Sequence, residues 1–560
     1  MEKTGFNILI GGEAGQGLVT IGQILAKTLV RSGYSIVVTQ SYESRIRGGH
    51  NTFAVRLSPD EIVGPQEPVD LLVALNAETV ALHRNELADQ GRILVDEECE
   101  TADDSCIRVP FKALASDKFS NVAALGVAGS LIGLDDKLIG TVMHEFFGKK
   151  DTQVAEENDR VLSEAYRWSA DQPVSIRKPA PVTNPRPRLM MNGNEAIALG
   201  AISAGLRFCS FYPMTPATSI VLNLTAKAKR MGLIVEQAED EIAAINMAIG
   251  ASFAGAPSMV ATSGGGYALM TEGVSLAGMT ETPVVVVVAQ RPGPATGLPT
   301  RTEQGDLEFV LHGGHGEFPR AILTPGTVEE CFHLTRKAFD VAERYQSPVF
   351  VLTDQFLADS YRSVEPFDID NLASVSAGAD SSGIPVPYRR FALTDDGVSP
   401  RLLPGMSEHL VLADSDEHTE DGHITEDLTV RNLMVEKRLR KGDGIRRDAM
   451  PPEMQGEGKP DLLLVSWGSS KGPVSEAASR VKDDGENVAT LHFSQVWPLV
   501  PDQFLGRLQE AREVACVEGN ATGQLAGLIR RETGFTIEKR VLRYDGLPLT
   551  PEWILRELKR

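Results

Sequence analysis

Five consecutive valines followed by an alanine, at 284–289, constrain the fold more than any other segment of the chain. β-branched side chains favour extended backbone, and a strand with no polar position must be covered on both of its faces. Strands of that kind are typical of parallel sheets with helices packed on each side. We therefore predict a doubly wound α/β sheet in which this segment is a buried strand.

Shorter apolar runs predict further strands, with helical patterns between them. They lie at 6–10, 35–39, 71–75, 93–95, 208–211, 233–235, 259–262, 349–352, 462–465, 489–492 and 513–517. A chain of 560 residues is too long for one hydrophobic core. The pattern predicts α/β domains with mostly parallel, doubly wound sheets at 1–170, 190–363 and 459–560. A proline-rich linker at 171–189 and an irregular connecting region at 364–458 would join them.

The charge and the cysteines restrict the possible partners. A formal net charge of −21 argues against nucleic acid or an anionic membrane, because both require a basic face. No apolar stretch approaches the about 20 residues that a membrane helix needs. The five cysteines are scattered and none forms a CxxC pair. We therefore expect a cytoplasmic protein in which this chain alone holds no metal or iron–sulfur cluster.

Ligands of parallel α/β sheets bind beyond the carboxyl ends of the strands, so the segments that follow the predicted strands are the expected site. Thr215 follows the strand at 208–211 and is predicted to cap a helix that begins at Pro216. Such a cap would leave backbone N–H groups free for an anion. Three acids at 239–241 begin the next helix, and the first two suit its dipole. Glu241 has apolar neighbours, which predict burial and a raised pKa.

Two more strand ends carry candidate residues. Ser263–Gly266 follows the strand at 259–262, and its three glycines would let a ligand approach the backbone closely. Arg291 follows the valine strand directly. Because a guanidinium at that place is costly without an anion, Arg291 indicates either a bound anion or a salt bridge to an acid near Glu241.

At these positions the chain resembles a known family. Tyr212–Pro216, which reads YPMTP, resembles the YPITP motif of 2-oxoacid:ferredoxin oxidoreductases, with Met214 where isoleucine is usual. The resemblance covers nearly the whole chain, in the order of a fused gamma–alpha subunit, and is most like the 2-oxoglutarate enzymes. Its other matching segments lie at 11–17, 44–51, 192–195, 297–306 and 518–525.

The resemblance implies a gamma domain, a pyrimidine-binding domain for thiamine diphosphate and a transketolase-like C-terminal domain. It implies an alpha subunit that shares the cofactor with a beta subunit, and that partner would hold the diphosphate, Mg²⁺ and a 4Fe–4S cluster. The complex would decarboxylate a 2-oxoacid, reduce ferredoxin and transfer the acyl group to coenzyme A as co-substrate. An (αβ)₂ heterotetramer is expected.

The same resemblance assigns roles to residues. Glu241 would hydrogen-bond the pyrimidine ring nitrogen and so activate the cofactor, and Arg291 would hold the substrate carboxylate. Thr215 and Thr300 would lie on the substrate side. Cofactor contacts are expected from Tyr212, Pro213, Glu241, Ser263, Gly264 and Gly265. Contacts to coenzyme A or another anion are expected from Gly15, Gly17, Arg45 and Arg47.

Several weaker sequence patterns are explained without a functional role. The GDG at 442–444 follows a basic stretch rather than a strand, so we do not expect it to bind magnesium diphosphate. His312 and His315 have metal-like spacing but no third ligand. The acidic run at 414–427 is predicted to be a solvated or interface loop. The glycine-rich turn at 12–17 either cradles a phosphate or is purely structural.

Other functions are disfavoured by what the sequence lacks. No acid follows the second strand to bind an NAD ribose, and no P-loop pattern is present, which argues against a dehydrogenase or a nucleotide-dependent ligase. A scaffold protein would not need Glu241 and Arg291, both of which are costly without a ligand. The fused form and the segment at 291–300 favour 2-oxoglutarate, with pyruvate or a branched-chain 2-oxoacid as alternatives and reductive carboxylation as the reverse direction.

Overall fold

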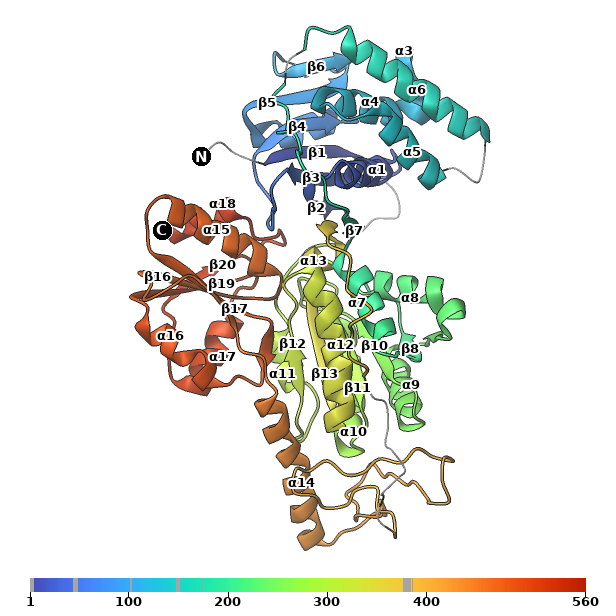
Figure 1. Ribbon diagram of the computed structural model, residues 1–560, viewed down its shortest axis with the longest axis vertical. Helices are drawn as coiled ribbons and strands as arrows, with labels where there is room; N and C mark the ends of the chain where they lie inside the picture. Colours follow the sequence, from blue (N-terminus) through green and yellow to red (C-terminus); the bar gives the residue numbers. More distant parts are fainter. Residues whose placement is uncertain are drawn as a thin grey trace. The chain divides into compact units, whose positions relative to one another are not determined.

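Every strand predicted above is present in the computed structural model of the chain (Figure 1). The structure describes residues 5–43, 49–100, 103–147, 152–174, 176–375, 384 and 386–560. Arg45 and Arg47, two of the predicted anion-binding residues, lie outside these ranges. The chain forms two compact units. The first comprises the chain up to Met191 with Asp359–Phe367 and Thr550–Trp553, and the second comprises the remainder.

The first unit is built on an eight-stranded sheet in the order β6-β5-β4-β1-β3-β2-β14-β7. Its pairs from β6 to β1 are parallel, and its pairs from β1 to β7 are antiparallel. The strands are β1 (Phe6–Glu13), β2 (Ser35–Ser41), β3 (His50–Ser58), β4 (Val69–Ala74), β5 (Leu87–Asp96), β6 (Cys106–Val109), β7 (Leu189–Met191) and β14 (Arg362–Val364). Strand β3 was not predicted, because polar residues such as Arg56 interrupt its apolar pattern. Arg56 is nevertheless buried, and its guanidinium donates to the Gly64 carbonyl at 2.7 Å.

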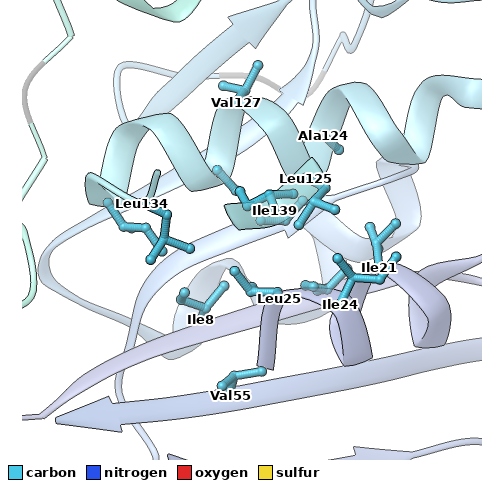
Figure 2. Packing of buried hydrophobic residues seen from close by; sticks show 14 of the residues in the cluster. Ile8, Ile21, Ile24, Leu25, Val55, Ala124, Leu125, Val127, Leu134 and Ile139 are labelled. Carbon is cyan, nitrogen blue, oxygen red and sulfur yellow. The ribbon is translucent and has the colours of Figure 1, made fainter. Parts of the chain in front are cut away.

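Helices cover this sheet and complete the core of the first unit. They are α1 (Leu18–Arg31), α2 (Ala77–His83), α3 (Phe111–Leu114), α4 (Ser120–Ile132), α5 (Asp136–Phe147) and α6 (Thr152–Ala170). Figure 2 shows Leu25 of α1, Leu125 of α4 and Ile8 of β1 among the buried side chains of this core. Gly22 permits the close packing of α1 on β3, since a Cβ atom there would lie 2.4 Å from the Phe53 ring.

The second unit contains two sheets. The larger has the order β18-β12-β13-β11-β10-β8-β9 and is parallel except at the β12–β18 pair. Its valine strand β11 is buried along its whole length between β10 and β13, as predicted. The strands are β8 (Phe208–Phe211), β9 (Ile234–Gln237), β10 (Ser258–Thr262), β11 (Val284–Gln290), β12 (Ala321–Leu323), β13 (Pro348–Asp354) and β18 (Gln495–Trp497).

The smaller sheet of the second unit has the order β15-β17-β16-β19-β20 and is parallel except at the β15–β17 pair. Its strands are β15 (Glu453–Gln455), β16 (Leu462–Trp467), β17 (Val488–Phe493), β19 (Glu513–Glu518) and β20 (Lys539–Leu542). One hydrophobic core joins the two sheets, because Val288 and Phe350 belong to the same buried cluster as Trp467 and Phe493.

The remaining helices of the chain are α7 (Gly193–Ser203), α8 (Thr218–Met231), α9 (Glu241–Phe253), α10 (Gly264–Met279), α11 (Leu307–His312), α12 (Val328–Tyr345), α13 (Gln355–Asp359), α14 (Leu428–Arg447), α15 (Lys471–Asp483), α16 (Leu505–Glu510), α17 (Gln524–Thr533) and α18 (Pro551–Leu558). Figure 1 labels most of these helices, and α14 extends away from the two sheets. In the part of the chain that the structure describes, no helix combines the length and the apolar character needed to cross a bilayer.

The region at 364–458 contains the 20-residue helix α14, which the sequence did not predict. The GDG at 442–444 is part of this helix, so its backbone has no free N–H groups in a loop to offer a phosphate. The acidic run at 414–427 is not solvated throughout. Its Glu417 forms a salt bridge to Arg438 of α14 at 2.8 Å, and its His418 is buried.

Helix α14 is held to the larger sheet by a buried cluster of charges. Glu281, in the turn before β11, lies 2.6 Å from the Nζ atom of Lys437 and 2.9 Å from that of Lys441. Arg390 donates to the Glu281 carbonyl at 2.8 Å. Burial opposes ionisation of Glu281, but Lys441 and Lys437 outweigh it and hold the pKa of this carboxyl well below its usual range. Glu281 is therefore the negative charge that balances this buried cluster.

Replacing this carboxylate tests the cluster. Glu281→Gln leaves the buried cations without a counter-charge, so we expect a loss of about 3–5 kcal/mol of stability, seen as a markedly lower thermal unfolding midpoint. The control is Glu513→Gln, which breaks an exposed pair with Lys539 of 2.9 Å and should cost less than about 1 kcal/mol. Equal shifts in the two variants would contradict this account.

Candidate functional site

The four predicted segments meet at the carboxyl ends of β8, β9, β10 and β11 in the second unit. The Arg291 guanidinium donates to the Thr215 carbonyl at 2.7 Å, which joins the ends of β11 and β8. A Cβ atom added at Gly266 would lie 2.6 Å from Oε1 of Glu241, which joins the ends of β10 and β9. The convergence expected from parallel-sheet topology is therefore present.

Glu241 is the first residue of α9 and is only 2% exposed, as its apolar neighbours predict. The preceding Asp240 is the N-cap, and its carboxylate accepts from the Ala243 amide at 2.8 Å. Burial raises the pKa of Glu241, and the charge of Asp240 raises it further. Oε1 of Glu241 is buried and has no hydrogen-bond partner among the described residues. A buried, unpaired oxygen of a carboxyl group whose pKa is raised is suited to share a proton with a ligand nitrogen.

The glycines after β10 form the first turn of α10 rather than a loop, and Ser263 is the N-cap residue. A Cβ atom at Gly266 would lie 2.1 Å from Oγ1 of Thr262 as well as against Glu241, so only glycine leaves room for the Glu241 carboxyl. Oγ of Ser263 makes no capping bond and is buried without a hydrogen-bond partner in the described part of the chain. This turn therefore presents open backbone and a free hydroxyl beside Glu241.

The prediction that Thr215 caps a helix is wrong. Residues 215–217 form a turn, and α8 begins at Thr218 with Ala217 at the N-cap position. The Thr215 carbonyl is bound by Arg291, so this residue contributes a backbone acceptor to the site rather than a row of free amides. The sequence pattern of a threonine followed by proline does not distinguish a cap from a turn that precedes the helix.

Arg291 is half-buried directly after β11. Burial lowers the pKa of this guanidinium, and the charge of Asp306 opposes that shift. Its guanidinium donates a hydrogen bond to a neutral carbonyl, that of Thr215. The acid that influences it most is Asp306 rather than Glu241. A half-buried guanidinium with a neutral hydrogen-bond partner retains donors for an anion.

Asp306 was not singled out from the sequence. Its carboxyl lies against the first turn of α10, because a Cβ atom at Gly264 would be 2.4 Å from its Oδ2 atom. Burial raises the pKa of Asp306 to about 6, and Arg291 opposes the shift. In the sequence, Asp306 is the last residue of the family segment at 297–306 and precedes a helix. An aspartate in that place is equally typical of an ordinary N-cap, so the sequence did not indicate a role in the site.

The other predicted residues of this site differ in exposure. Thr300 is nearly buried, whereas Tyr212 is 40% exposed and Pro213 and Gly265 are also exposed. Large apolar side chains on the same segments are exposed as well, among them Ile242 and Leu298. The carboxyl end of the sheet therefore presents an apolar surface around the polar groups.

Gly15 and Gly17 lie in the first unit, in the turn between β1 and α1. Both have positive φ angles, 102° and 74°, which glycine adopts without strain. The turn is closed by Gln16, whose side-chain oxygen accepts from the Glu13 amide at 2.7 Å. The turn is thus a defined structure whose role in anion binding stays a prediction.

The histidine pair at 312 and 315 does not form a shared site. His312 lies 3.3 Å from a carboxylate oxygen of Glu308, one turn earlier on α11, and the His315 carbonyl accepts from Ser275. Over the described ranges, no three His, Cys, Asp or Glu side chains are grouped to hold a metal ion.

Gly266→Ala tests the geometry around Glu241. The added methyl group would overlap the Thr262 hydroxyl and the Glu241 carboxyl, so we expect a lower unfolding midpoint and at least tenfold weaker binding of the thiamine diphosphate that the resemblance implies. The control is Gly250→Ala in α9, where a Cβ atom meets nothing within 4 Å and the helix should gain up to about 1 kcal/mol. Unchanged cofactor affinity in Gly266→Ala would contradict the arrangement.

Known proteins match this chain along both units. The family model "Pyruvate ferredoxin/flavodoxin oxidoreductase" matches residues 7–168, and "Pyruvate flavodoxin/ferredoxin oxidoreductase, thiamine diP-bdg" matches residues 199–437. The alpha subunit of a 2-oxoacid:ferredoxin oxidoreductase from a Sulfolobus species is 32% identical, over 96% of this chain and 94% of that protein. The 2-oxoglutarate oxidoreductase subunit KorA of Mycobacterium tuberculosis is 28% identical, over 93% of this chain and 86% of that protein.

A solved structure is similar over the whole length. It is the 2-oxoglutarate:ferredoxin oxidoreductase of Magnetococcus marinus, with 2-oxoglutarate, coenzyme A and succinyl-CoA bound, and it is 31% identical. It aligns with a TM-score of 0.93 and covers 100% of this chain and 99% of that one. The resemblance found in the motifs is confirmed: this chain belongs to the 2-oxoacid:ferredoxin oxidoreductases, thiamine-diphosphate-dependent enzymes, as an alpha subunit of the fused gamma–alpha form.

Proposed function

We propose that this chain, with a beta subunit, catalyses the coenzyme A-dependent oxidative decarboxylation of 2-oxoglutarate to succinyl-CoA and CO₂, with ferredoxin as the electron acceptor. The observation that carries the proposal is the buried, unpaired Oε1 atom of Glu241 beside the open first turn of α10. This Oε1 atom belongs to a carboxyl with a raised pKa and has no hydrogen-bond partner in the described structure that would explain its burial.

The residues around Glu241 fit the pyrimidine half of thiamine diphosphate. Glu241 would hydrogen-bond a ring nitrogen, and the glycines of α10 would let the flat ring approach the backbone. Ser263 would supply a hydroxyl, and Tyr212 and Pro213 would line the exposed side. Thiamine diphosphate, when bound, would supply a nucleophilic carbon for the 2-oxo carbon and a cationic ring that accepts the electron pair released as CO₂ leaves.

Arg291 would hold the 2-oxoacid carboxylate. Its guanidinium is already oriented by the Thr215 carbonyl, and a planar fork suits a carboxylate in a bidentate arrangement. Thr215 and Thr300 would complete the substrate side. Glu241 would thus control the protonation of the cofactor, and Arg291 would orient the substrate carboxylate.

The rest of the active site would come from the beta subunit. We assign the diphosphate, Mg²⁺ and a 4Fe–4S cluster to that partner, in an (αβ)₂ heterotetramer. The exposed large apolar side chains on the site segments, such as Tyr212, Ile242 and Leu298, support a covering partner, since a partner would remove their apolar surface from water. Gly15, Gly17, Arg45 and Arg47 are proposed contacts for coenzyme A, and the cytoplasm is the proposed location.

The substrate is proposed from the relatives named for 2-oxoglutarate, and a turnover assay tests it. The complex of both subunits should reduce viologen in the presence of coenzyme A and 2-oxoglutarate, with a kcat/KM at least tenfold above that for pyruvate or branched 2-oxoacids. A preference for pyruvate would replace the substrate assignment. Absence of activity with every 2-oxoacid would overturn the proposed function.

Removal of the guanidinium separates substrate binding from cofactor binding. Arg291→Ala should raise the KM for the 2-oxoacid by about 100-fold, because a charge-assisted pair is lost, while thiamine diphosphate content stays near normal. The control is Arg207→Ala, an exposed arginine at the amino end of β8, whose guanidinium donates to the Met231 carbonyl. Loss of bound cofactor in Arg291→Ala would reassign this residue to the cofactor side.

A further inference from the structure

Two carboxyl groups flank the first turn of α10. Glu241 lies against Gly266, and Asp306 lies against Gly264, where an added Cβ atom would be 2.4 Å from Oδ2 and 2.7 Å from Oδ1. Arg291 is the residue whose charge acts on Asp306. The Asp306 backbone is bound to Gln290, the residue before Arg291, and the proposed cofactor contact of Glu241 does not use the Asp306 carboxyl.

The position of Asp306 in the chain does not explain its side chain. It is the N-cap residue of α11, where an aspartate ordinarily accepts hydrogen bonds from the first turn of its helix. It makes no such bond here, and Oδ2 is buried with no hydrogen-bond partner among the described residues. A buried carboxyl oxygen left unpaired costs about 1–3 kcal/mol, so a ligand-dependent role is indicated.

The backbone around Asp306 is held in place. Its amide donates to Oε1 of Gln290 at 2.9 Å, and Gln290 is the last residue of β11, immediately before Arg291. Asp306 and Arg291 are therefore both anchored to the end of the same buried strand. Their charges interact, although no salt bridge within 4.0 Å joins them in the described structure.

We propose that Asp306 is a positioning residue for the substrate side, which competes with the 2-oxoacid carboxylate for the charge of Arg291 and takes up one proton from solvent when that carboxylate binds. The inference rests on the proposed role of Arg291. Only the protonation state of Asp306 changes: the carboxylate becomes a carboxylic acid, and no covalent bond of the substrate is altered.

The electrostatics give the direction of the effect. Burial raises the pKa of Asp306 to about 6, and Arg291 is the charge that keeps it from rising further. A substrate carboxylate bound at Arg291 cancels that charge and adds a negative one, so the pKa of Asp306 must rise on binding. Proton uptake is then largest at pH values between the pKa of Asp306 in the free protein and its pKa in the substrate complex. It vanishes at lower pH, where Asp306 is already protonated before the substrate binds.

The other titratable group near Asp306 is Glu303, on the same loop. Burial raises the pKa of Glu303, and the charge of Asp306 raises it further. The first turn of α10, which packs against Asp306, carries no acid and no base. Asp306 must thus be distinguished from Glu303 and also from Glu241, which lies against Gly266 and has a raised pKa. Each of the three has an isosteric amide variant.

Calorimetry on the complex of both subunits, freed of thiamine diphosphate so that no decarboxylation occurs, measures this linkage. 2-Oxoglutarate is titrated at pH 7 in buffers of different ionisation enthalpy, and the buffer dependence of the heat reports the protons taken up. We expect more than about half a proton per anion at pH 7 and nearly none at pH 5. In the wild type the affinity should fall up to about tenfold per pH unit above pH 6.

Asp306→Asn should abolish the proton uptake and flatten the pH dependence, and it should bind 2-oxoglutarate more tightly than the wild type at pH 8. Glu303→Gln should keep the uptake. If the wild type binds 2-oxoglutarate at pH 7 without taking up a proton, the inference is wrong. The proposed function would still stand in that case if the complex turns over 2-oxoglutarate. Uptake that persists in Asp306→Asn would overturn the inference as well. If Asp306→Asn does not fold, loss of the proton uptake in Glu303→Gln would overturn the inference.

Discussion

Burial of β11 on both faces is the constraint on which the second unit depends. All seven of its residues are buried, so neighbouring strands must pair with both of its edges and helices must cover both of its faces. Strands β10 and β13 pair with it in parallel. Parallel pairing brings the carboxyl ends of β8, β9, β10 and β11 to one edge of the sheet, and the polar groups of the site are attached to that edge. The site is a consequence of this topology.

The loop that follows β11 is fixed at its far end by the C-terminal part of the chain. Gln304 donates to the Trp467 carbonyl at 2.9 Å and accepts from the Gly519 amide at 2.7 Å. Its own amide donates to the Gly519 carbonyl at 2.6 Å. Arg291, Thr300 and Asp306 therefore lie on a segment held by β11 at one end and by the smaller sheet at the other. The shared core of the two sheets keeps both ends of this segment at a fixed distance.

The site retains polar atoms that the fold does not satisfy. Glu241 Oε1, Ser263 Oγ and Asp306 Oδ2 are all buried without partners in the described structure, whereas most buried polar atoms are paired. The contrast with Glu281 is informative. That carboxylate is equally buried but is balanced by lysines, and its role is to hold α14. Glu241 and Asp306 have no salt bridge in the described structure, whereas Glu281 has two.

The sequence by itself determined the strands formed by apolar runs, the parallel topology around β11, the family and the cluster of segments at the strand ends. These follow from local patterns, namely apolar runs and motifs. Only the tertiary structure decided that Thr215 lies in a turn whose carbonyl binds Arg291, that β3 and α14 exist, and that Asp306 turns away from its own helix. Each of these depends on contacts between residues distant in the chain, such as Lys437 with Glu281, and no local pattern reports a partner's position.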